Sequence, residues 1–255
     1  MIQMGANVGR LVFGATAIAF GLITLAWHEF NGHLLLDMWS APGGLLFVYA
    51  VAAAQIFGGV AIQFRRLAKS GAVTLGVVYL FFTLLWIPQI AATPQIFDPW
   101  GNFFEEFTLV VGAGFVYASA SAQLKPATVI RVGCVLLGVC ALSFAIYQAV
   151  HPHYTAGLVP AWLPPNQMFW VMATTIAFAL AAVALLLNRA ALLAARLMTL
   201  MIVLFGLLVW VPLLISDPQK HSNWDEIAEN FAIAGAAWIF ADLLGKYRSA
   251  KINAA

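Results

Sequence analysis

Histidines and carboxylates crowd the end of the first long apolar run of the chain. The segment AWHEFNGHLLLDMWSAP, residues 26–42, places His28, Glu29, His33 and Asp37 there. Imidazole nitrogens and carboxylate oxygens bind zinc, iron or copper, and an imidazole also relays protons. His28 and His33 lie five residues apart and do not share a helix face, so their spacing does not define a metal site. The segment predicts a polar lid at the rim of an apolar body. Metal or heme ligation, loop hydrogen bonding and proton relay are its three alternatives.

A second polar segment, HPHYTAGLVPAWLPP, occupies residues 151–165 and matches residues 28–42 at a shift of 123. His28 then corresponds to His151, and Trp39 to Trp162. The sequence has no HExxH motif and no four-ligand cassette, so any metal would need ligands from both segments. The candidate metal ligands are His28, His33, His151 and His153.

Two glutamates occupy equivalent places in a further pair of matching segments. WGNFFEEF, residues 100–107, aligns with WDEIAENF, residues 224–231, at a shift of 124, which pairs Glu105 with Glu229. Asp98 and Ser222 are the predicted N-caps of the two helices that follow. Each glutamate lies seven residues beyond its predicted cap, about 10 Å along a helix, which is too deep for a capping role.

A carboxyl at that depth would cost a few kcal/mol or more if it faced lipid. Glu105 and Glu229 should therefore face the interior of the bundle or a wet cavity. There a carboxyl either ties neighbouring helices together or handles protons, a cation or a ligand. We name both as the candidate catalytic residues. The acids nearer the second cap, Asp225 and Glu226, are predicted only to complement the positive end of the helix dipole.

Tryptophan and proline recur together in a third pair of segments. LLWIPQI, residues 84–90, aligns with LVWVPLL, residues 208–214, and both carry a W-x-P motif. A proline inside a helix removes one backbone hydrogen bond and kinks the helix, and membrane helices tolerate such kinks. Such a kink usually serves only to bend the helix. Together with the neighbouring tryptophan, it is also suited to line a quinone-sized pocket. The candidate ligand-binding residues are His28, His151, Trp86, Trp210, Trp100 and Trp224.

The composition indicates the class of protein that carries these candidate residues. The 255 residues are 63% hydrophobic and only 9% charged, whereas a soluble domain has about 25% charged residues. The apolar surplus must face lipid, so the sequence predicts an integral membrane protein. The net charge of +2, without any Lys/Arg-rich run, argues against a nucleic-acid partner. Cys134 and Cys140 lie in one apolar run without a CxxC motif and are predicted to be inert.

Eight apolar windows are long enough to cross a bilayer core about 30 Å thick. Backbone groups in lipid must be satisfied within the segment, so each window is a helix and the fold class is all-α and polytopic. The expected spans are Val8–Trp27, Gly43–Phe64, Ala72–Ala92, Phe103–Ala122, Val132–Val150, Met168–Leu187, Leu197–Ser216 and Ile227–Leu244.

Charges predict the orientation of these spans. Eleven of the twelve basic residues fall at the termini and at alternate loops, and only Lys220 falls on the opposite side. By the positive-inside rule the basic side is cytoplasmic. Both termini then lie on the cytoplasmic side of a bacterial-type inner membrane. All five histidines fall at the opposite, outer loops.

The three pairs of matching segments belong to one longer alignment. Residues 10–123 align with residues 131–245, nearly without gaps, which predicts a duplicated four-helix unit. Four is an even number, so the two copies run through the membrane in the same sense, as a parallel repeat. The predicted organisation is a first four-helix bundle at residues 1–122, a cytoplasmic linker at 123–130 and a second bundle at 131–255.

The four-span unit resembles the DoxX-like family of small membrane proteins. The resemblance rests on the basic residue before the first span, on the W-x-P third helix and on the Pro- and Trp-bearing loop HPHYTAGLVPAWLPP. It implies a four-helix membrane bundle. The family includes a subunit of thiosulfate:quinone oxidoreductase and other proteins linked to membrane redox chemistry or thiol stress. This chain departs from the family in its tandem fusion and in lacking a CxxC motif.

The leading functional hypothesis is a redox-linked membrane subunit that binds a quinone or another small apolar ligand near the outer leaflet. Glu105 and Glu229 would donate and accept protons, and His28 and His151 would line the entrance to the ligand site. Its partners would be the lipid bilayer and other membrane or periplasmic redox subunits. The alternatives are a transporter for a small solute or metal ion, and a non-catalytic scaffold subunit of a larger membrane complex. No enzyme class follows from the residues.

Overall fold

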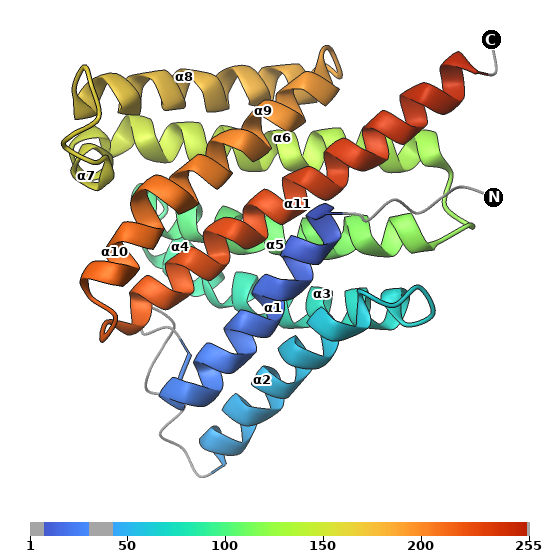
Figure 1. The fold of residues 1–255 in the computed structure, drawn as a ribbon, viewed down its shortest axis with the longest axis horizontal. Helices are drawn as coiled ribbons and strands as arrows, with labels where there is room; N and C mark the ends of the chain where they lie inside the picture. Colours follow the sequence, from blue (N-terminus) through green and yellow to red (C-terminus); the bar gives the residue numbers. More distant parts are fainter. Residues whose placement is uncertain (1–7, 31–42, 254–255) are drawn as a thin grey trace.

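The computed structural model describes residues 8–30 and 43–253, and this part of the chain is built from helices (Figure 1). Within it, eight helices are long and apolar enough to cross a membrane, which confirms the expected all-α polytopic fold. They are α1 (Val8–Trp27), α2 (Gly44–Ala61), α3 with α4 (Ala68–Leu85, Ile87–Ala92), α5 (Asp98–Ala120), α6 (Pro126–Val150), α8 (Gln167–Leu186), α9 with η2 and α10 (Ala191–Phe205, Gly206–Trp210, Val211–Ser216) and α11 (His221–Ile252). A short helix, α7 (Pro152–Leu158), lies between α6 and α8.

Several helices begin earlier than the apolar windows suggested. Helix α5 starts at Asp98 instead of Phe103, and α6 starts at Pro126, inside the expected linker. A proline in the first turn of each helix presets its backbone angle, so the helix extends into polar sequence. The expected N-caps were wrong: the cap positions are Phe97 and Lys220, and neither makes a side-chain capping bond.

The two W-x-P motifs interrupt their helices in different ways. In the first half, α3 ends at Leu85 and α4 begins at Ile87, with Trp86 between them. In the second half, α9 passes into a π-helical turn, η2, which runs straight into α10. The missing amide of a proline explains why the regular hydrogen-bond ladder fails in this region. π-Helical turns widen a helix locally and are frequent at functional sites.

Each half of the chain uses the same order of helix neighbours. Helix α1 packs on α2, α2 on α3 and α3 on α5, and likewise α6 packs on α8, α8 on α9 and α9 on α11. The halves also interlock, because α1 packs along α11, α6 packs against α5, and α5 and α11 contact each other. The division into two units and the duplication behind it stay predictions.

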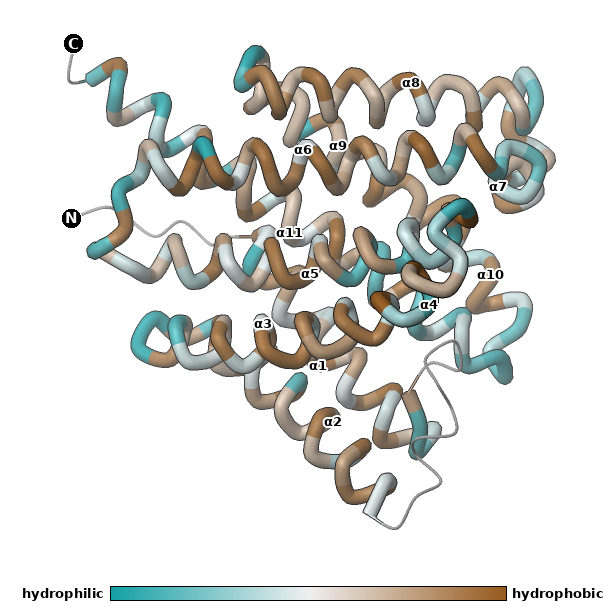
Figure 2. Tube along the Cα trace, turned by 180° about the vertical axis from the view of Figure 1, so that it is seen from behind, coloured by the Kyte–Doolittle hydropathy of each residue, from teal (hydrophilic) through white to brown (hydrophobic). Residues whose placement is uncertain are grey.

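The basic loops gather at one end of the molecule. Figure 1 shows the start of α1, the end of α11 and the α2–α3, α5–α6 and α8–α9 connections at that end, with α4, α7 and α10 at the other. We call the latter the α7/α10 end. Figure 2 shows hydrophobic residues along the long helices and hydrophilic residues concentrated toward the connections. The apolar helices imply a bilayer environment, and the cytoplasmic placement of the termini stays a prediction.

Glycines bring the backbones of α1 and α2 into contact. A single added methyl group at this contact should therefore destabilise the protein. A Cβ at Gly59 would lie 2.5 Å from the carbonyl oxygen of Gly14, whereas a Cβ at Gly114 would meet nothing within 4 Å. We expect Gly59→Ala to lower the free energy of unfolding by about 1–3 kcal/mol, because the helices must move apart. Gly114→Ala, the control, should leave it unchanged or raise it slightly. SDS titration followed by circular dichroism measures both, and equal effects would contradict this packing.

Candidate functional site

Two cavities flank the contact between α5 and α11. The smaller, of about 50 Å³, lies among α1, α2, α3, α5 and α11, and we call it the small pocket. The larger, of about 590 Å³, lies among α5, α6, α7, α8, α9, η2 and α11, and we call it the large cavity. The large cavity includes residues of α7 and of the first turn of α5, and the small pocket includes Thr24 in the last turn of α1 and Asp225 near the start of α11, so both extend toward the α7/α10 end.

Neighbouring glutamates on α5 serve different cavities. Glu105 lines the large cavity, and Glu106 lines the small pocket. Successive residues of a helix are about 100° apart around its axis, so one helix can present an acid to each side. Helix α11 does the same, with Glu226 on the large cavity and Asp225 and Glu229 on the small pocket. The glutamates that the sequence paired, Glu105 and Glu229, therefore line different cavities.

The large cavity combines apolar walls with a few polar groups. Its apolar lining includes Phe144, Met201 and Phe205, and Trp210 of η2 also lines it. The polar groups come from α5, α6, α7, α8 and α11, and they include Asn102, Glu105, Tyr147, Gln148, Tyr154, Thr155, Thr174, Glu226 and Asn230. A cavity of this size and lining is typical of small-molecule sites, which span about 300–1,000 Å³.

One polar wall of the large cavity is held in place by hydrogen bonds. The side-chain oxygen of Gln148, which is buried, accepts from the hydroxyls of Thr174 at 3.0 Å and Thr175 at 3.1 Å. Each threonine hydroxyl also lies within hydrogen-bonding distance of a carbonyl of its own helix, so its single proton is shared between the two acceptors. These bonds tie α6 to α8 and fix the shape of the wall between them.

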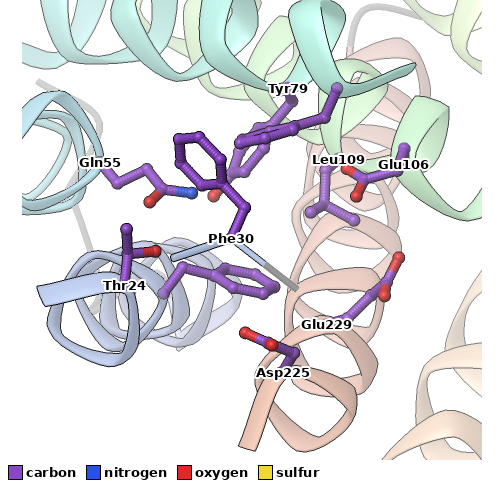
Figure 3. Close-up of a pocket in the computed structure, with 10 residues that line it drawn as sticks. Thr24, Phe30, Gln55, Tyr79, Glu106, Leu109, Asp225 and Glu229 are labelled. Atoms are coloured by element: carbon purple, nitrogen blue, oxygen red, sulfur yellow. The ribbon is translucent and has the colours of Figure 1, made fainter. Parts of the chain in front are cut away.

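The small pocket is lined by oxygen-bearing side chains. Figure 3 shows Thr24 and the amide of Gln55 on one side, and the carboxyls of Glu106 and Glu229 on the other. Asp225 completes the acidic side. The carboxyl of Glu229 lies close enough to interact electrostatically with four other acids, Glu105, Glu106, Asp225 and Glu226. A negative charge in one cavity therefore affects the acids of the other cavity.

A histidine connects the acidic side of the small pocket to the protein surface. His221 Nδ1 lies 3.3 Å from Glu29 Oε1, and His221 Nε2 lies 3.1 Å from Asp225 Oδ2. The ring of Trp27 stacks on the imidazole, with centroids 4.8 Å apart and an interplanar angle of 12°. Sequence reasoning did not select His221, because its counterpart in the first half is Phe97.

The histidines proposed as metal ligands have other partners. His28 Nδ1 lies 2.9 Å from the hydroxyl of Tyr49, and His151 Nε2 lies 2.7 Å from Asp98 Oδ1. His153 lies in α7, and His33 is outside the described residues. Between residues 8–30 and 43–253, no group of three or more His, Cys, Asp or Glu side chains could hold a metal ion. The metal site stays a prediction.

The tryptophans proposed for ligand binding fall into three roles. Trp210 lines the large cavity, whereas Trp86 is buried and lines neither cavity. The indole nitrogens of Trp100 and Trp224 donate to the carbonyls of Pro94 at 3.2 Å and Pro218 at 2.9 Å. Both of these tryptophans lie outside the two linings and close the loops that precede their helices.

A third tryptophan makes the same loop closure and also faces the large cavity. The indole nitrogen of Trp170 donates to the carbonyl of Pro164 at 2.9 Å, again six residues earlier in the chain. The recurring Pro-x5-Trp spacing is the sequence signal that could have identified all three closures.

No protein-family model, curated protein or solved structure matches the chain. The functional argument therefore rests on the two cavities and on the residues that line them.

Proposed function

We propose that this integral membrane protein binds a quinone or a similar small ligand in the large cavity. The ligand has an apolar body and a hydrogen-bonding head group. The observation that carries the proposal is the large cavity itself, with its apolar walls and with Glu105 and Glu226 on one side. Its volume suits a single ring system with a short tail. Tyr147 and Trp170 offer further polar and aromatic contacts.

In this proposal Glu105 exchanges protons with the head group. Conversion of a quinone to a quinol takes up two protons and two electrons. The electrons come from a partner redox subunit, and the chain supplies the binding site and the protons. A carboxyl within reach of the head group suits that task because it both donates and accepts a proton. The proposed role of the protein is thus a redox-linked membrane subunit, in keeping with its resemblance to the DoxX-like family.

The same proposal places the large cavity near the outer leaflet of a bacterial-type inner membrane. The support is the basic end of the molecule, which carries the start of α1 and the end of α11 and lies opposite the α7/α10 end. A transporter needs a polar path toward the basic end as well. The polar groups of the large cavity instead gather near the first turns of α5 and α11 and near the last turns of α6, which favours ligand binding over transport.

Quinone binding by the purified protein tests the proposal. We expect decylubiquinone, a short-tailed quinone, to quench tryptophan fluorescence saturably, because Trp170 and Trp210 line the large cavity. Glu105→Gln should weaken binding about tenfold, the value of one hydrogen bond to a charged or strongly polar group. Isothermal titration calorimetry gives the same constants without relying on fluorescence.

The matched control is the neighbouring residue. Glu106 lines the small pocket, so Glu106→Gln should leave the affinity for decylubiquinone within about twofold of the wild type. The proposal fails if the wild-type protein shows no saturable binding. It also fails if the two glutamine variants weaken binding equally.

A further inference from the structure

The acids of the small pocket lack a basic partner in its lining. Glu106, Asp225 and Glu229 line the pocket, and its described lining includes no lysine, arginine or histidine. Like charges at close range repel, and an apolar surrounding makes each uncompensated carboxylate costly. Asp225 has His221 beside it, just outside the lining, whereas Glu106 and Glu229 have no basic group in the lining and therefore require protons or cations as companions.

Two buried polar groups that face the same pocket point to a small polar occupant. The side-chain oxygen of Gln55 and the hydroxyl of Tyr79 have no hydrogen-bond partner among the residues that the structure describes. Gln55 is only 4% exposed and Tyr79 only 1% exposed, and both line the pocket. Buried polar atoms are normally satisfied by protein or by ordered water. The volume of about 50 Å³ gives room for roughly three or four water-sized occupants.

A chain of titratable groups leads from the surface to the small pocket. The side chain of Glu29 is 48% exposed, while those of His221 and Asp225 are 11% and 9% exposed. The imidazole has a carboxyl oxygen close to each nitrogen, at 3.3 Å and 3.1 Å. The 3.1 Å pair is not aligned as a hydrogen bond, because His221 Nε2 and Asp225 Oδ2 both lack a hydrogen-bond partner among the described residues, so the last transfer needs a small turn of either side chain. A proton that reaches Nδ1 from Glu29 is balanced by the release of the Nε2 proton to Asp225, so the ring ends neutral.

We infer that the small pocket is a proton-binding site, filled from the α7/α10 end through Glu29, His221 and Asp225. Protons are favoured over a coordinated metal because the described part of the chain contains no group of His, Cys, Asp and Glu side chains that could hold one. The inference deepens the proposed function: it rests on that function only in naming the source of the protons for Glu105. The pocket itself needs no ligand in the large cavity.

The groups around the acids of the two cavities come from seven helices. Helices α1 and α2 contribute only the non-ionisable Thr24 and Gln55 to the lining. Beside the pocket acids lie Tyr79 of α3, Glu105 and Glu106 of α5, Glu29 after α1, and His221, Asp225, Glu226 and Glu229 of α11. Tyr147 of α6 and Tyr154 of α7 line the large cavity near Glu105 and Glu226. Lys220 acts on Glu226, on the other side of α11.

Infrared spectroscopy of the full chain in lipid nanodiscs tests the inference without any quinone. A protonated carboxyl has a carbonyl stretching band that is absent from a carboxylate and that shifts when its proton is replaced by deuterium. We expect this band at neutral pH in the wild type, and we expect it to weaken in Glu229→Gln and in Glu106→Gln. These isosteric variants keep the volume of the side chain, and circular dichroism verifies that each is folded.

The route is tested by the rate at which the band shifts after transfer to D₂O. His221→Gln, which keeps hydrogen-bonding capacity but cannot take up a proton, should slow the shift at least tenfold while the band persists. His28→Gln is the matched control, because His28 precedes Glu29 directly but contacts Tyr49.

Three outcomes would overturn the inference, and none of them bears on quinone binding. The first is a wild-type spectrum without a protonated-carboxyl band at neutral pH. The second is an unchanged exchange rate in His221→Gln. The third is loss of the band on addition of Na⁺ or Ca²⁺, with a rise in melting temperature that Glu229→Gln abolishes, which would assign the pocket to a metal cation.

Discussion

An Ala177→Trp variant is expected to lose quinone binding by about a hundredfold or more, equivalent to roughly 2.7 kcal/mol. Ala177 belongs to α8 and lines the large cavity. An indole in place of its methyl group occupies the volume that the ligand needs, so the apolar contacts of the ligand are lost. Titration with decylubiquinone, monitored by calorimetry, measures the effect.

The preceding residue provides the control for this variant. Ile176 is 54% exposed and lies outside the lining of the large cavity. Ile176→Trp adds a comparable bulk toward lipid, so binding should stay within about twofold of the wild type. If the two tryptophan variants bind equally well, the ligand lies elsewhere in the protein.

Phe13→Ala is expected to be the most destabilising of the simple truncations, at about 3 kcal/mol. The ring of Phe13 is fully buried and meets Tyr79 edge to face, with centroids 6.0 Å apart. A Cβ at Gly112 would lie 2.7 Å from the ring, and one at Gly235 would lie 2.9 Å from the backbone of Phe13. The side chain thus fills the point where α1 meets α3, α5 and α11, and its loss leaves a cavity there.

The free energy of unfolding in SDS titrations measures this loss, with Leu11→Ala as the reference. Leu11 is 57% exposed and belongs to the same helix. Lipid tails are as apolar as leucine, so this truncation should change the free energy by less than about 1 kcal/mol. Similar values for the two variants would show that α1 does not pack in the interior.

Hydropathy was sufficient to predict the eight spans but not the details of their ends. Each membrane crossing needs a long apolar run, and such runs are visible without a structure. The apolar window of this span began only at Phe103, whereas the cap predicted at Asp98 placed the start of α5 within one residue of its position. The π-helical turn before Pro212 was missed, because the motif around Pro88 is nearly the same and produces an ordinary break.

The candidate site was predicted only in part, because it depends on which helices meet. The repeat drew attention to Glu105 and Glu229, whereas Glu106 corresponds to Asn230 and was passed over. The contact of His221 with Glu29 exists because α1 packs on α11. That pairing joins different halves of the chain, so no local pattern reports it.

The contact between α5 and α6 also joins the two halves, and the sequence repeat does not reveal its ion pair either. At the contact of α6 with α5, His151 ends one helix and Asp98 begins the other. At the contact of α1 with α11, the acid follows the first helix and the histidine begins the second. The two junctions therefore carry the same kind of pair with the order of acid and base reversed. Aligning His28 with His151 hides this relation, because it compares residues of like type.

The interlocking of α1 with α11 bears on how the protein is made. The ribosome releases α1 into the bilayer long before α11 has been synthesised, yet α11 covers one face of α1. During that interval the surface around Phe13 and Gly9 is held by lipid or by an insertion chaperone instead of its final partner. Assembly is thus completed after translation of the last helix, and a nascent chain that stops short of α11 leaves the earliest helix without its closest neighbour.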